Sequence, residues 1–361
     1  MTWLPLRDEL KGLHPYGAPQ LDVPVRLNTN ENPFQPPRDF IEDLGTTVVE
    51  VAKTLNRYPD RDATKLRTEL AKYLAVESET PGIGAENIWV GNGSNEVMTH
   101  VMQAFGGPGR RALTFTPTYS MYEEYARNTF TEFVTVPRRD DFTVDAELAV
   151  NAVRDMAPDV VFLASPNNPT GTAQALDVLP QMLAAFDGML VVDEAYAEFR
   201  RVGVPSAVSL VDAHPRLIVT RTMSKAFGFA GARLGYLMAH PDVVDALRIV
   251  RLPYHLSSLT QAVALTALRH ADELQAQVQL LRAERNAIVD WLQGEGYETT
   301  PSDANFVMYG KFTDRHATWQ ALVDEGVLVR EVGPEGFLRV SIGTAAEMER
   351  FKDATKKVGH A

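Results

Sequence analysis

The sequence predicts an α/β protein with a mostly parallel sheet in a large domain, followed by a smaller α+β domain. Short apolar runs of strand length alternate with helical patterns through the middle of the chain, which is typical of a parallel sheet covered by helices on both faces. The 361 residues are enough for a large domain and a smaller one. Beyond Leu252-Pro253-Tyr254, two longer helical patterns precede mixed strands and helices. We expect an N-terminal arm over 1–37, a large domain over 38–250 and a small domain over 251–361.

The arm is rich in proline and asparagine, as in Leu27-Asn28-Thr29-Asn30-Glu31-Asn32-Pro33. Proline lacks a backbone N–H and restricts the residue before it, so the arm cannot form one continuous helix. We expect an extended segment that lies over another part of the fold.

The large domain is expected to begin with a helix over 64–74. A strand over 87–90 then leads through a glycine-rich turn into a helix over 96–105. In the small domain, helices are expected over 260–269 and 272–293. Further apolar strands of the large domain are expected at 111–115, 160–164, 189–192 and 217–220.

Composition narrows the class of protein. Hydrophobic residues make up 45% and charged residues 23% of the chain, as in a soluble globular protein. The net charge of −12 argues against binding to nucleic acid or anionic membranes, since both repel an acidic surface. The chain has no cysteine, and its histidines show no metal-binding pair at H-x-x-x-H spacing. The sequence therefore predicts no metal site. Because neither a signal peptide nor an apolar run of membrane-spanning length is visible, it also predicts a cytoplasmic enzyme.

Lys225 lies in Thr222-Met223-Ser224-Lys225-Ala226-Phe227-Gly228, a run of small and apolar residues that suits a solvated surface charge poorly. An apolar setting lowers the pKa of a lysine and so favours the neutral amine. A neutral amine is nucleophilic and can form a Schiff base with the aldehyde of pyridoxal phosphate (PLP). Lys225 is therefore a predicted catalytic residue, and PLP is the predicted cofactor when the two upstream segments described next are considered with it.

Two upstream segments supply side chains that a PLP ring requires. Asp193 ends an apolar strand, where it could keep the pyridine nitrogen protonated, and Tyr196 lies three residues further on, within reach of the same ligand. Asn168 lies in Ser165-Pro166-Asn167-Asn168-Pro169-Thr170-Gly171, directly after another buried strand and thus at the carboxyl edge of the sheet. It could donate a hydrogen bond to the ring oxygen, and the Asn168–Pro169 bond is a candidate cis peptide.

Both segments have plainer interpretations. The prolines and glycine of 165–171 are ordinary turn residues, so that segment alone also fits a simple turn. Asp193 and Glu194 after a strand also fit the metal-binding carboxylates of nucleotide hydrolases. The chain has no G-x-x-x-x-G-K-[ST] phosphate loop to accompany them, which argues against that interpretation.

A phosphate site is predicted at Gly91-Asn92-Gly93-Ser94-Asn95-Glu96, between a strand and a helix. Free backbone N–H groups and the positive end of a helix favour an anion there. The turn lacks the third glycine of a dinucleotide motif, so taken alone it fits a plain turn, and taken with Lys225 it fits the phosphate of PLP. Arg233 and Ser224 could bind the same phosphate. The alternative for Arg233, a surface ion pair, is disfavoured by its small and apolar neighbours.

Arg339 lies mid-strand in Phe337-Leu338-Arg339-Val340-Ser341, where a charge is costly unless it is paired. The carboxylate of a substrate and an internal glutamate are its two candidate partners. Tyr119, which follows Pro117-Thr118, could stack on the PLP ring or belong to the core.

In this order, the segments resemble the fold-type I PLP-dependent aminotransferases, and more narrowly the actinobacterial form of the histidinol-phosphate aminotransferase family. The resemblance covers essentially the whole chain, and it is the combination of segments that makes it specific. Besides 165–171 and 222–227, they are Pro15-Tyr16-Gly17, Leu27 to Pro33, Arg57-Tyr58-Pro59-Asp60, Arg251-Leu252-Pro253-Tyr254-His255-Leu256-Ser257-Ser258 and Pro301-Ser302-Asp303-Ala304-Asn305-Phe306.

The resemblance implies a role for each matching residue. Lys225 would hold the cofactor covalently and move the substrate proton, while Asp193 would pair with the ring nitrogen. Asn168 and Tyr196 would hold the ring oxygen, and Tyr119 would stack on the ring. The implied phosphate and cofactor contacts are Ser94, Asn95, Thr222, Ser224, Arg233 and Tyr58 from the other subunit. The implied substrate contacts are Arg339 with the carboxylate, Arg330 with the phosphate, and Tyr16 and Tyr254 around the imidazole, with Asn95 as a further contact.

The activity implied by the resemblance is a homodimeric transaminase. It would interconvert imidazole-acetol phosphate plus glutamate with histidinol phosphate plus 2-oxoglutarate by a ping-pong route. An aromatic amino-acid aminotransferase is the main alternative, since it would share the cofactor residues. A threonine-phosphate decarboxylase of the same fold and a non-catalytic PLP-sensing regulator are further alternatives. The regulator would need a DNA-binding module, and no basic helical module precedes residue 30.

Overall fold

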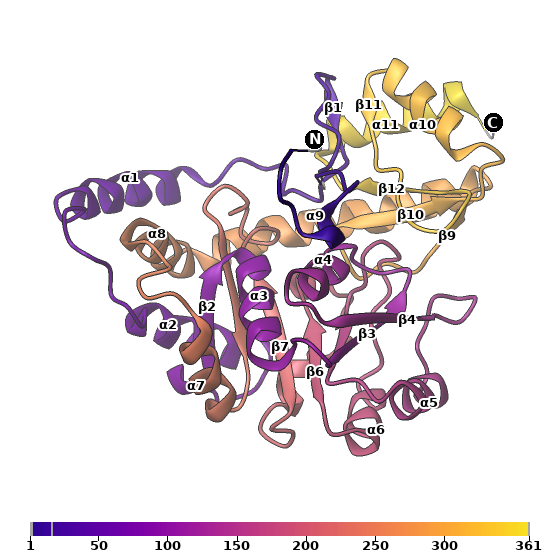
Figure 1. The fold of residues 1–361 in the computed structure, drawn as a ribbon. Coiled ribbons are helices and arrows are strands. Elements are labelled where there is room, and N and C mark those ends of the chain that lie inside the picture. Colours follow the sequence, from indigo (N-terminus) through magenta and orange to yellow (C-terminus); the bar gives the residue numbers. More distant parts are fainter. Residues whose placement is uncertain (1–2, 16, 360–361) are drawn as a thin grey trace.

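The large domain is built on a seven-stranded sheet with the order β2-β8-β7-β6-β5-β3-β4 (Figure 1). The computed structural model describes residues 3–15 and 17–359. β8 runs antiparallel to β2 and β7, and the other neighbouring strands are parallel. The strands are β2 (Ile88–Asn92), β3 (Arg111–Thr116), β4 (Glu132–Pro137), β5 (Val160–Ala164), β6 (Met189–Asp193), β7 (Leu217–Thr222) and β8 (Leu234–Met238). The predicted α/β class with a mostly parallel sheet is confirmed.

Helices cover both faces of this sheet. Side chains alternate along a strand, so Val161 and Leu163 of β5 pack into one core while Val160 and Phe162 pack into another. The first core includes α2 (Thr64–Glu77), α5 (Ala146–Met156) and α6 (Val178–Ala185). The second includes α3 (Gly93–Phe105), α4 (Met121–Asn128) and α7 (Pro241–Val250). Burial of both faces explains why the central strands, such as β5 and β6, are continuous apolar runs.

One predicted boundary was wrong in a way that affects the site. The helix expected from residue 96 begins at Gly93, directly after β2, so no separate glycine-rich turn precedes it. Gly93 has φ +79°, a conformation that glycine adopts at little cost. Ser94 and Asn95 therefore lie in the first turn of α3, at the helix N-terminus.

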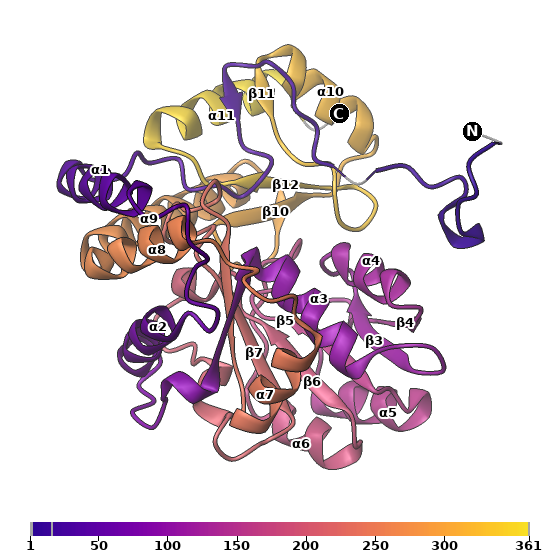
Figure 2. The same cartoon turned by 60° about the vertical axis from the view of Figure 1, so that its left-hand side comes forward.

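The small domain contains an antiparallel sheet with the order β12-β10-β9. Figures 1 and 2 show its C-terminal elements together at one end of the molecule, beside the edge of the large sheet. A short parallel pair joins β1 of the arm to β11. The arm strand is β1 (Val25–Arg26). The elements of the small domain are α9 (Ala271–Gly294), β9 (Glu298–Thr299), β10 (Phe306–Gly310), α10 (Arg315–Asp324), β11 (Val327–Leu328), β12 (Phe337–Ser341) and α11 (Ala345–Val358).

Past β1, the arm leads to α1 (Arg38–Ala52), which lies at the margin of the molecule (Figure 1). α1 packs against α8 (Ser258–Arg269), and α8 also contacts α2. The predicted domain limits at 37 and 250 stay predictions. None of the helices within residues 3–15 and 17–359 is long and apolar enough to cross a membrane.

Candidate active site

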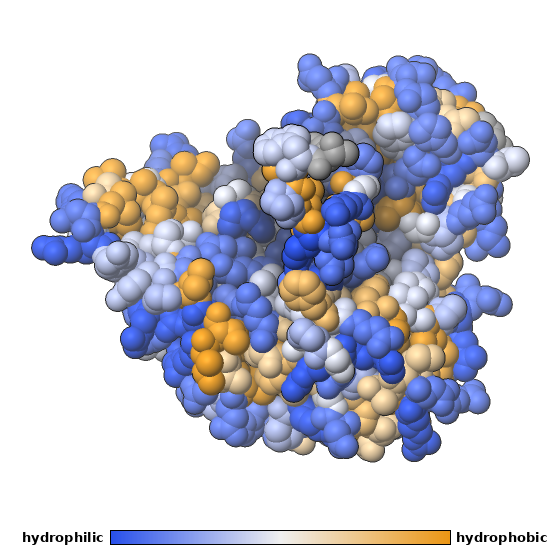
Figure 3. Space-filling model, viewed as in Figure 1, coloured by the Kyte–Doolittle hydropathy of each residue, from blue (hydrophilic) through white to orange (hydrophobic). Residues whose placement is uncertain are grey.

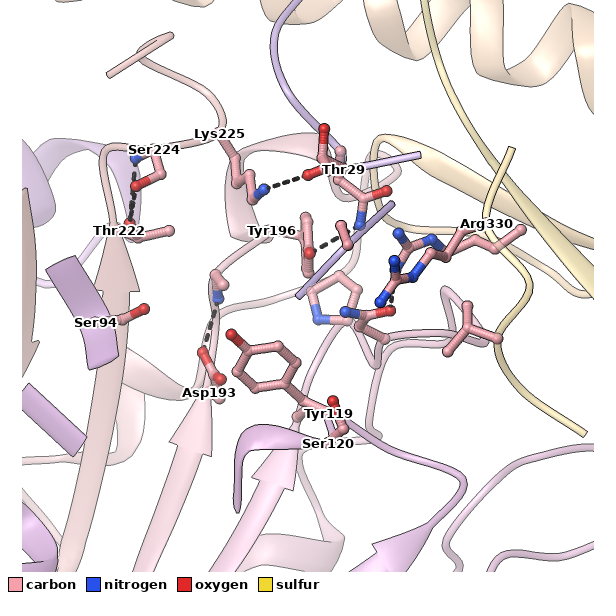
Figure 4. A pocket seen from close by; sticks show the side chains of 18 of the residues that line it. Thr29, Ser94, Tyr119, Ser120, Asp193, Tyr196, Thr222, Ser224, Lys225 and Arg330 are labelled. Atoms are coloured by element: carbon pink, nitrogen blue, oxygen red, sulfur yellow. Dashed lines mark hydrogen bonds between the residues drawn. The ribbon is translucent and has the colours of Figure 1, made fainter. Parts of the chain in front are cut away.

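A cavity of about 250 Å³ lies where the carboxyl ends of β5, β6 and β7 face the small domain and the arm. This is the edge at which open α/β sheets bind ligands. Figure 4 shows side chains from these separate elements pointing into the common space. Of the residues predicted from the sequence, the cavity is lined by Ser94, Asn95, Tyr119, Asn168, Asp193, Tyr196, Thr222, Ser224, Lys225, Arg233, Arg330 and Arg339.

Lys225 follows β7, and its Nζ donates a hydrogen bond to the backbone carbonyl of Thr29, 2.8 Å away (Figure 4). Removal from water lowers the pKa of this amine to about 8, and the positive charges of Arg339 and Arg233 act in the same direction. A lysine with this pKa is partly neutral near physiological pH. It is therefore available as a nucleophile and as a base.

Asp193 is the last residue of β6, and its carboxylate is buried at the floor of the cavity. Oδ2 accepts a hydrogen bond from the Tyr122 hydroxyl at 2.9 Å, and Oδ1 accepts from the Thr220 hydroxyl at 3.2 Å. Burial raises the pKa of Asp193, whereas these hydrogen bonds oppose the rise by stabilising the ionised form. A buried carboxylate held in this way is suited to a cationic partner.

An anion cradle forms between the start of α3 and the segment after β7. Arg233 Nη1 donates to the Ser224 hydroxyl at 3.3 Å, and the Thr222 hydroxyl donates to the same oxygen at 3.0 Å. A Cβ at Gly93 would collide with the Arg233 guanidinium, so the glycine allows this close approach. Hydroxyls, a guanidinium and a helix N-terminus together are the donors that phosphate groups bind in proteins.

Tyr196 and Asn168 border the cavity beside Asp193, and each is held by a second residue. Asn30 of the arm donates to the Tyr196 hydroxyl at 3.0 Å, and Arg339 donates to Oδ1 of Asn168. The Asn168–Pro169 bond is cis, which confirms that prediction. Tyr119 lies at the cavity wall, with its ring edge-on to that of Tyr122 at 5.6 Å.

Arg330 and Arg339 line the cavity from the small domain, and Figure 4 shows Arg330 beside the other cavity residues. Their backbones are hydrogen-bonded to each other in both directions at 2.9 Å, so the two residues lie directly opposite. Arg339 also donates to the carbonyl of Asn28, and its guanidinium lies over the Phe306 ring at 5.1 Å. The two guanidinium groups make this wall of the cavity positively charged, which suits an anionic ligand.

Tyr58 and Tyr254 lie outside the cavity of this single chain. Tyr58 is 80% exposed, and its ring stacks on that of Tyr254 with 4.4 Å between centroids. Tyr16 lies outside the described residues.

Residues 23–354 match the family described as aminotransferase class I and II. The chain is 60% identical to a histidinol-phosphate aminotransferase of Thermobifida fusca over 97% of this chain and 94% of that protein. It is 53% identical to a histidinol-phosphate aminotransferase of Mycolicibacterium vanbaalenii over 99% and 96%. The chain belongs to the histidinol-phosphate aminotransferase family.

Its structure is similar to that of a family member from Sinorhizobium meliloti in complex with pyridoxal-5'-phosphate. The TM-score is 0.81 at 27% identity, and the match covers 93% of this chain and 91% of that one. The chain is thus a fold-type I aminotransferase that uses PLP. The residues present fit this cofactor, because the cavity combines a lysine of lowered pKa, a buried carboxylate and a cradle for phosphate.

Behind the aminotransferase site lies a buried ion cluster that no sequence pattern predicted. Arg221 of β7 donates to Glu194 Oε2 at 2.8 Å, and it also pairs with Glu77 and Glu198. Burial raises the pKa of Glu198 to about 7. Glu194 also accepts from the Ser206 hydroxyl at 2.7 Å. Although adjacent in sequence, Asp193 and Glu194 thus face opposite sides of the sheet, one toward the cavity and one toward this cluster.

Proposed function

We propose that this chain transfers an amino group between histidinol phosphate and 2-oxoglutarate, with imidazole-acetol phosphate and glutamate as products, in histidine biosynthesis. The relatives that match it over nearly their full length carry the name of this enzyme. The observation that carries the proposal is the cavity, where two opposed arginines for anionic substrates lie beside the PLP residues. A location in the cytoplasm stays a prediction from the sequence.

The cavity residues suggest how PLP would be held. PLP, when bound, supplies an aldehyde and an electron-withdrawing ring that stabilises a carbanion at the substrate carbon. Asp193 would keep the ring nitrogen protonated, and Tyr196 and Asn168 would bind the ring oxygen. Tyr119 would pack against the ring. The phosphate would be bound by Ser94, Asn95, Thr222, Ser224 and Arg233.

Lys225 would carry out the proton transfer. Its amine would hold the cofactor covalently and, when free, would act as the base that moves the proton of the substrate carbon. A base works best when its pKa is near the working pH, and the lowered pKa of Lys225 meets this condition.

Arg330 and Arg339 would serve both substrates in turn. Histidinol phosphate presents a phosphate and no α-carboxylate, whereas glutamate presents two carboxylates. A guanidinium binds carboxylate and phosphate with the same pair of N–H donors. The two arginines at one wall of the cavity could thus accept either anion without rearrangement of the fold.

The substrate proposal predicts a selective effect of Arg330→Ala. Loss of one charge-assisted contact to a buried anion costs about 2–3 kcal/mol, or roughly 30- to 150-fold in kcat/KM. We expect that loss for histidinol phosphate and little change for phenylalanine, each measured in steady state with 2-oxoglutarate. Arg339→Ala is expected to affect both substrates. An equal loss for both substrates in Arg330→Ala would make Arg330 structural, and equal wild-type efficiency on both would favour an aromatic aminotransferase.

We further propose that the enzyme is a homodimer in which Tyr58 binds the cofactor phosphate of the other subunit. Tyr58 lies outside the cavity of its own chain and is largely exposed. It is accompanied by further exposed apolar side chains, and Figure 3 shows hydrophobic surface over α1. An exposed apolar surface of this kind favours burial against a partner. These side chains are Ile41, Val48, Val49, Leu55, Ile249, Leu252 and Tyr254.

Mixing inactive variants tests this arrangement. If Tyr58 acts across the dimer, a mixed dimer of Lys225→Ala and Tyr58→Ala chains has one site with both residues intact. In a random mixture half of the dimers are mixed, so about a quarter of wild-type activity should return. Lys225→Ala mixed with Arg233→Ala is the control and should restore nothing, because both residues lie in the same chain's cavity. A fully active monomer in solution would refute the proposal.

A further inference from the structure

The hydroxyl of Tyr122 bonds to the carboxylate expected to face the PLP ring nitrogen. It donates to Asp193 Oδ2 at 2.9 Å, and the Tyr122 side chain is completely buried. Burial and the neighbouring Asp193 charge raise the pKa of Tyr122 well above its ordinary value. The phenol therefore keeps its proton and stays a hydrogen-bond donor at working pH.

The surrounding structure fixes this hydroxyl in place. Tyr122 belongs to the first turn of α4, and its ring stacks on Phe162 of β5 with 4.7 Å between centroids and 9° between planes. The ring of Tyr119, three residues earlier in the chain, also contacts that of Tyr122 edge-on, with 5.6 Å between centroids. A ring packed against two aromatic neighbours offers its hydroxyl in one direction at little entropic cost.

We propose that Tyr122 is a positioning residue that keeps the proton of the Asp193–cofactor pair on the ring nitrogen. The proposal rests on the proposed function, in which Asp193 faces that nitrogen. A hydrogen bond donated to a carboxylate stabilises its ionised form and makes it a weaker base. Without the bond, Asp193 would compete more strongly for the shared proton. The ring nitrogen would then lose positive charge and with it part of its capacity to stabilise a carbanion.

Thr220 is the secondary donor of the same carboxylate. Its hydroxyl lies 3.2 Å from Asp193 Oδ1, a longer contact than that of Tyr122, and it is uncharged at any pH. The titratable groups around the pair are Glu194, whose charge raises the Asp193 pKa, and Tyr119 and Tyr125 beside Tyr122. The two hydroxyls predict a graded series, with a larger effect of Tyr122→Phe and a smaller effect of Thr220→Val.

The test uses Tyr122→Phe, which removes one oxygen and keeps the stacked ring. PLP carrying an NMR-active nitrogen isotope at the ring position reports directly whether that nitrogen is protonated. We expect a protonated signal in the wild type and a shift toward the unprotonated signal in Tyr122→Phe. We also expect kcat to fall roughly 10- to 100-fold, the effect of one hydrogen bond to a charged group. KM for the amino donor should change little.

Tyr309→Phe is the matched control. It removes the hydroxyl of another completely buried tyrosine, in the core of the small domain, and should leave the nitrogen signal and kcat unchanged. A wild-type nitrogen signal in Tyr122→Phe overturns the proposal. If Tyr122→Phe does not fold, a wild-type signal in Thr220→Val overturns it, because hydrogen bonds to Asp193 would then not control the ring nitrogen. Asp193→Asn distinguishes a failure of the Tyr122 proposal from a failure of the proposed function. If its nitrogen signal is also that of the wild type, Asp193 is not the partner of the ring and the proposed site fails with it.

Discussion

The Lys225→Ala protein is expected to lose nearly all transaminase turnover. Positioned acid–base groups contribute about 10²- to 10⁴-fold, and the substitution removes the covalent link to the cofactor as well. Borohydride treatment of the wild type should attach the cofactor to the peptide that contains Lys225. The same treatment of Lys225→Ala should attach none, as measured by mass spectrometry.

The lowered pKa of Lys225 adds a prediction on pH. The amine is neutral, and hence nucleophilic, only above its pKa. The rate at which the protein without cofactor captures PLP should therefore rise with pH and level off above about 8, well below the ordinary lysine value of 10.5. A rapid-mixing absorbance experiment measures this profile.

Lys72→Ala is the control for both experiments, because Lys72 is an exposed lysine that pairs with Glu69 at 2.9 Å on α2. It should retain wild-type turnover and the wild-type capture profile. Normal turnover in Lys225→Ala, or a capture rate that still rises steeply at pH 10, would contradict the assignment of Lys225.

The sequence identified the parts of this fold that depend on local pattern. The strand 160–164 was predicted with its observed bounds, since both of its faces are buried and the whole segment is apolar. β4 was missed because it lies at the sheet edge, and its side chains are partly or fully exposed at most positions, which gives no continuous apolar run. β8 was missed in spite of an apolar segment, Leu234–Met238, because its antiparallel place between β2 and β7 depends in part on β2, which is far away in the chain.

In the site too, features with a local sequence pattern were predictable, whereas contacts between distant segments were not. Lys225 and Asp193 stand out in sequence because a charge within an apolar segment is unusual. The Thr29 carbonyl that binds Lys225 is 196 residues away in the chain, and Tyr122 is 71 residues away from Asp193. Neither partner has a local signal for its contact. Tyr122 lies three residues after Tyr119, in the first turn of α4, but this spacing does not indicate the contact with Asp193.

The second large effect is expected at Asp193, and its neighbour Glu194 provides the contrast. Asp193→Ala should still bind PLP, but kcat should fall about 10²- to 10³-fold, the range for loss of one preorganised electrostatic group. Without the carboxylate the ring nitrogen loses its proton more readily, so the carbanion is less well stabilised. Cofactor content by absorbance and steady-state kinetics measure the two quantities separately.

Glu194→Ala should act on stability instead. Glu194 is buried and binds Arg221, and removing one partner of a buried ion pair leaves the other charge uncompensated, at about 3–5 kcal/mol. Arg221 keeps Glu77 and Glu198, so the lower end of that range is expected. Denaturant unfolding should show this loss of stability for Glu194→Ala and little loss for Asp193→Ala. The effects on kcat per folded molecule should be the reverse.

If turnover of Asp193→Ala falls less than about tenfold, or roughly 1.4 kcal/mol of barrier, Asp193 is not the partner of the ring nitrogen. Two carboxylates that are adjacent in sequence would then share a structural role, although they lie on opposite faces of the sheet.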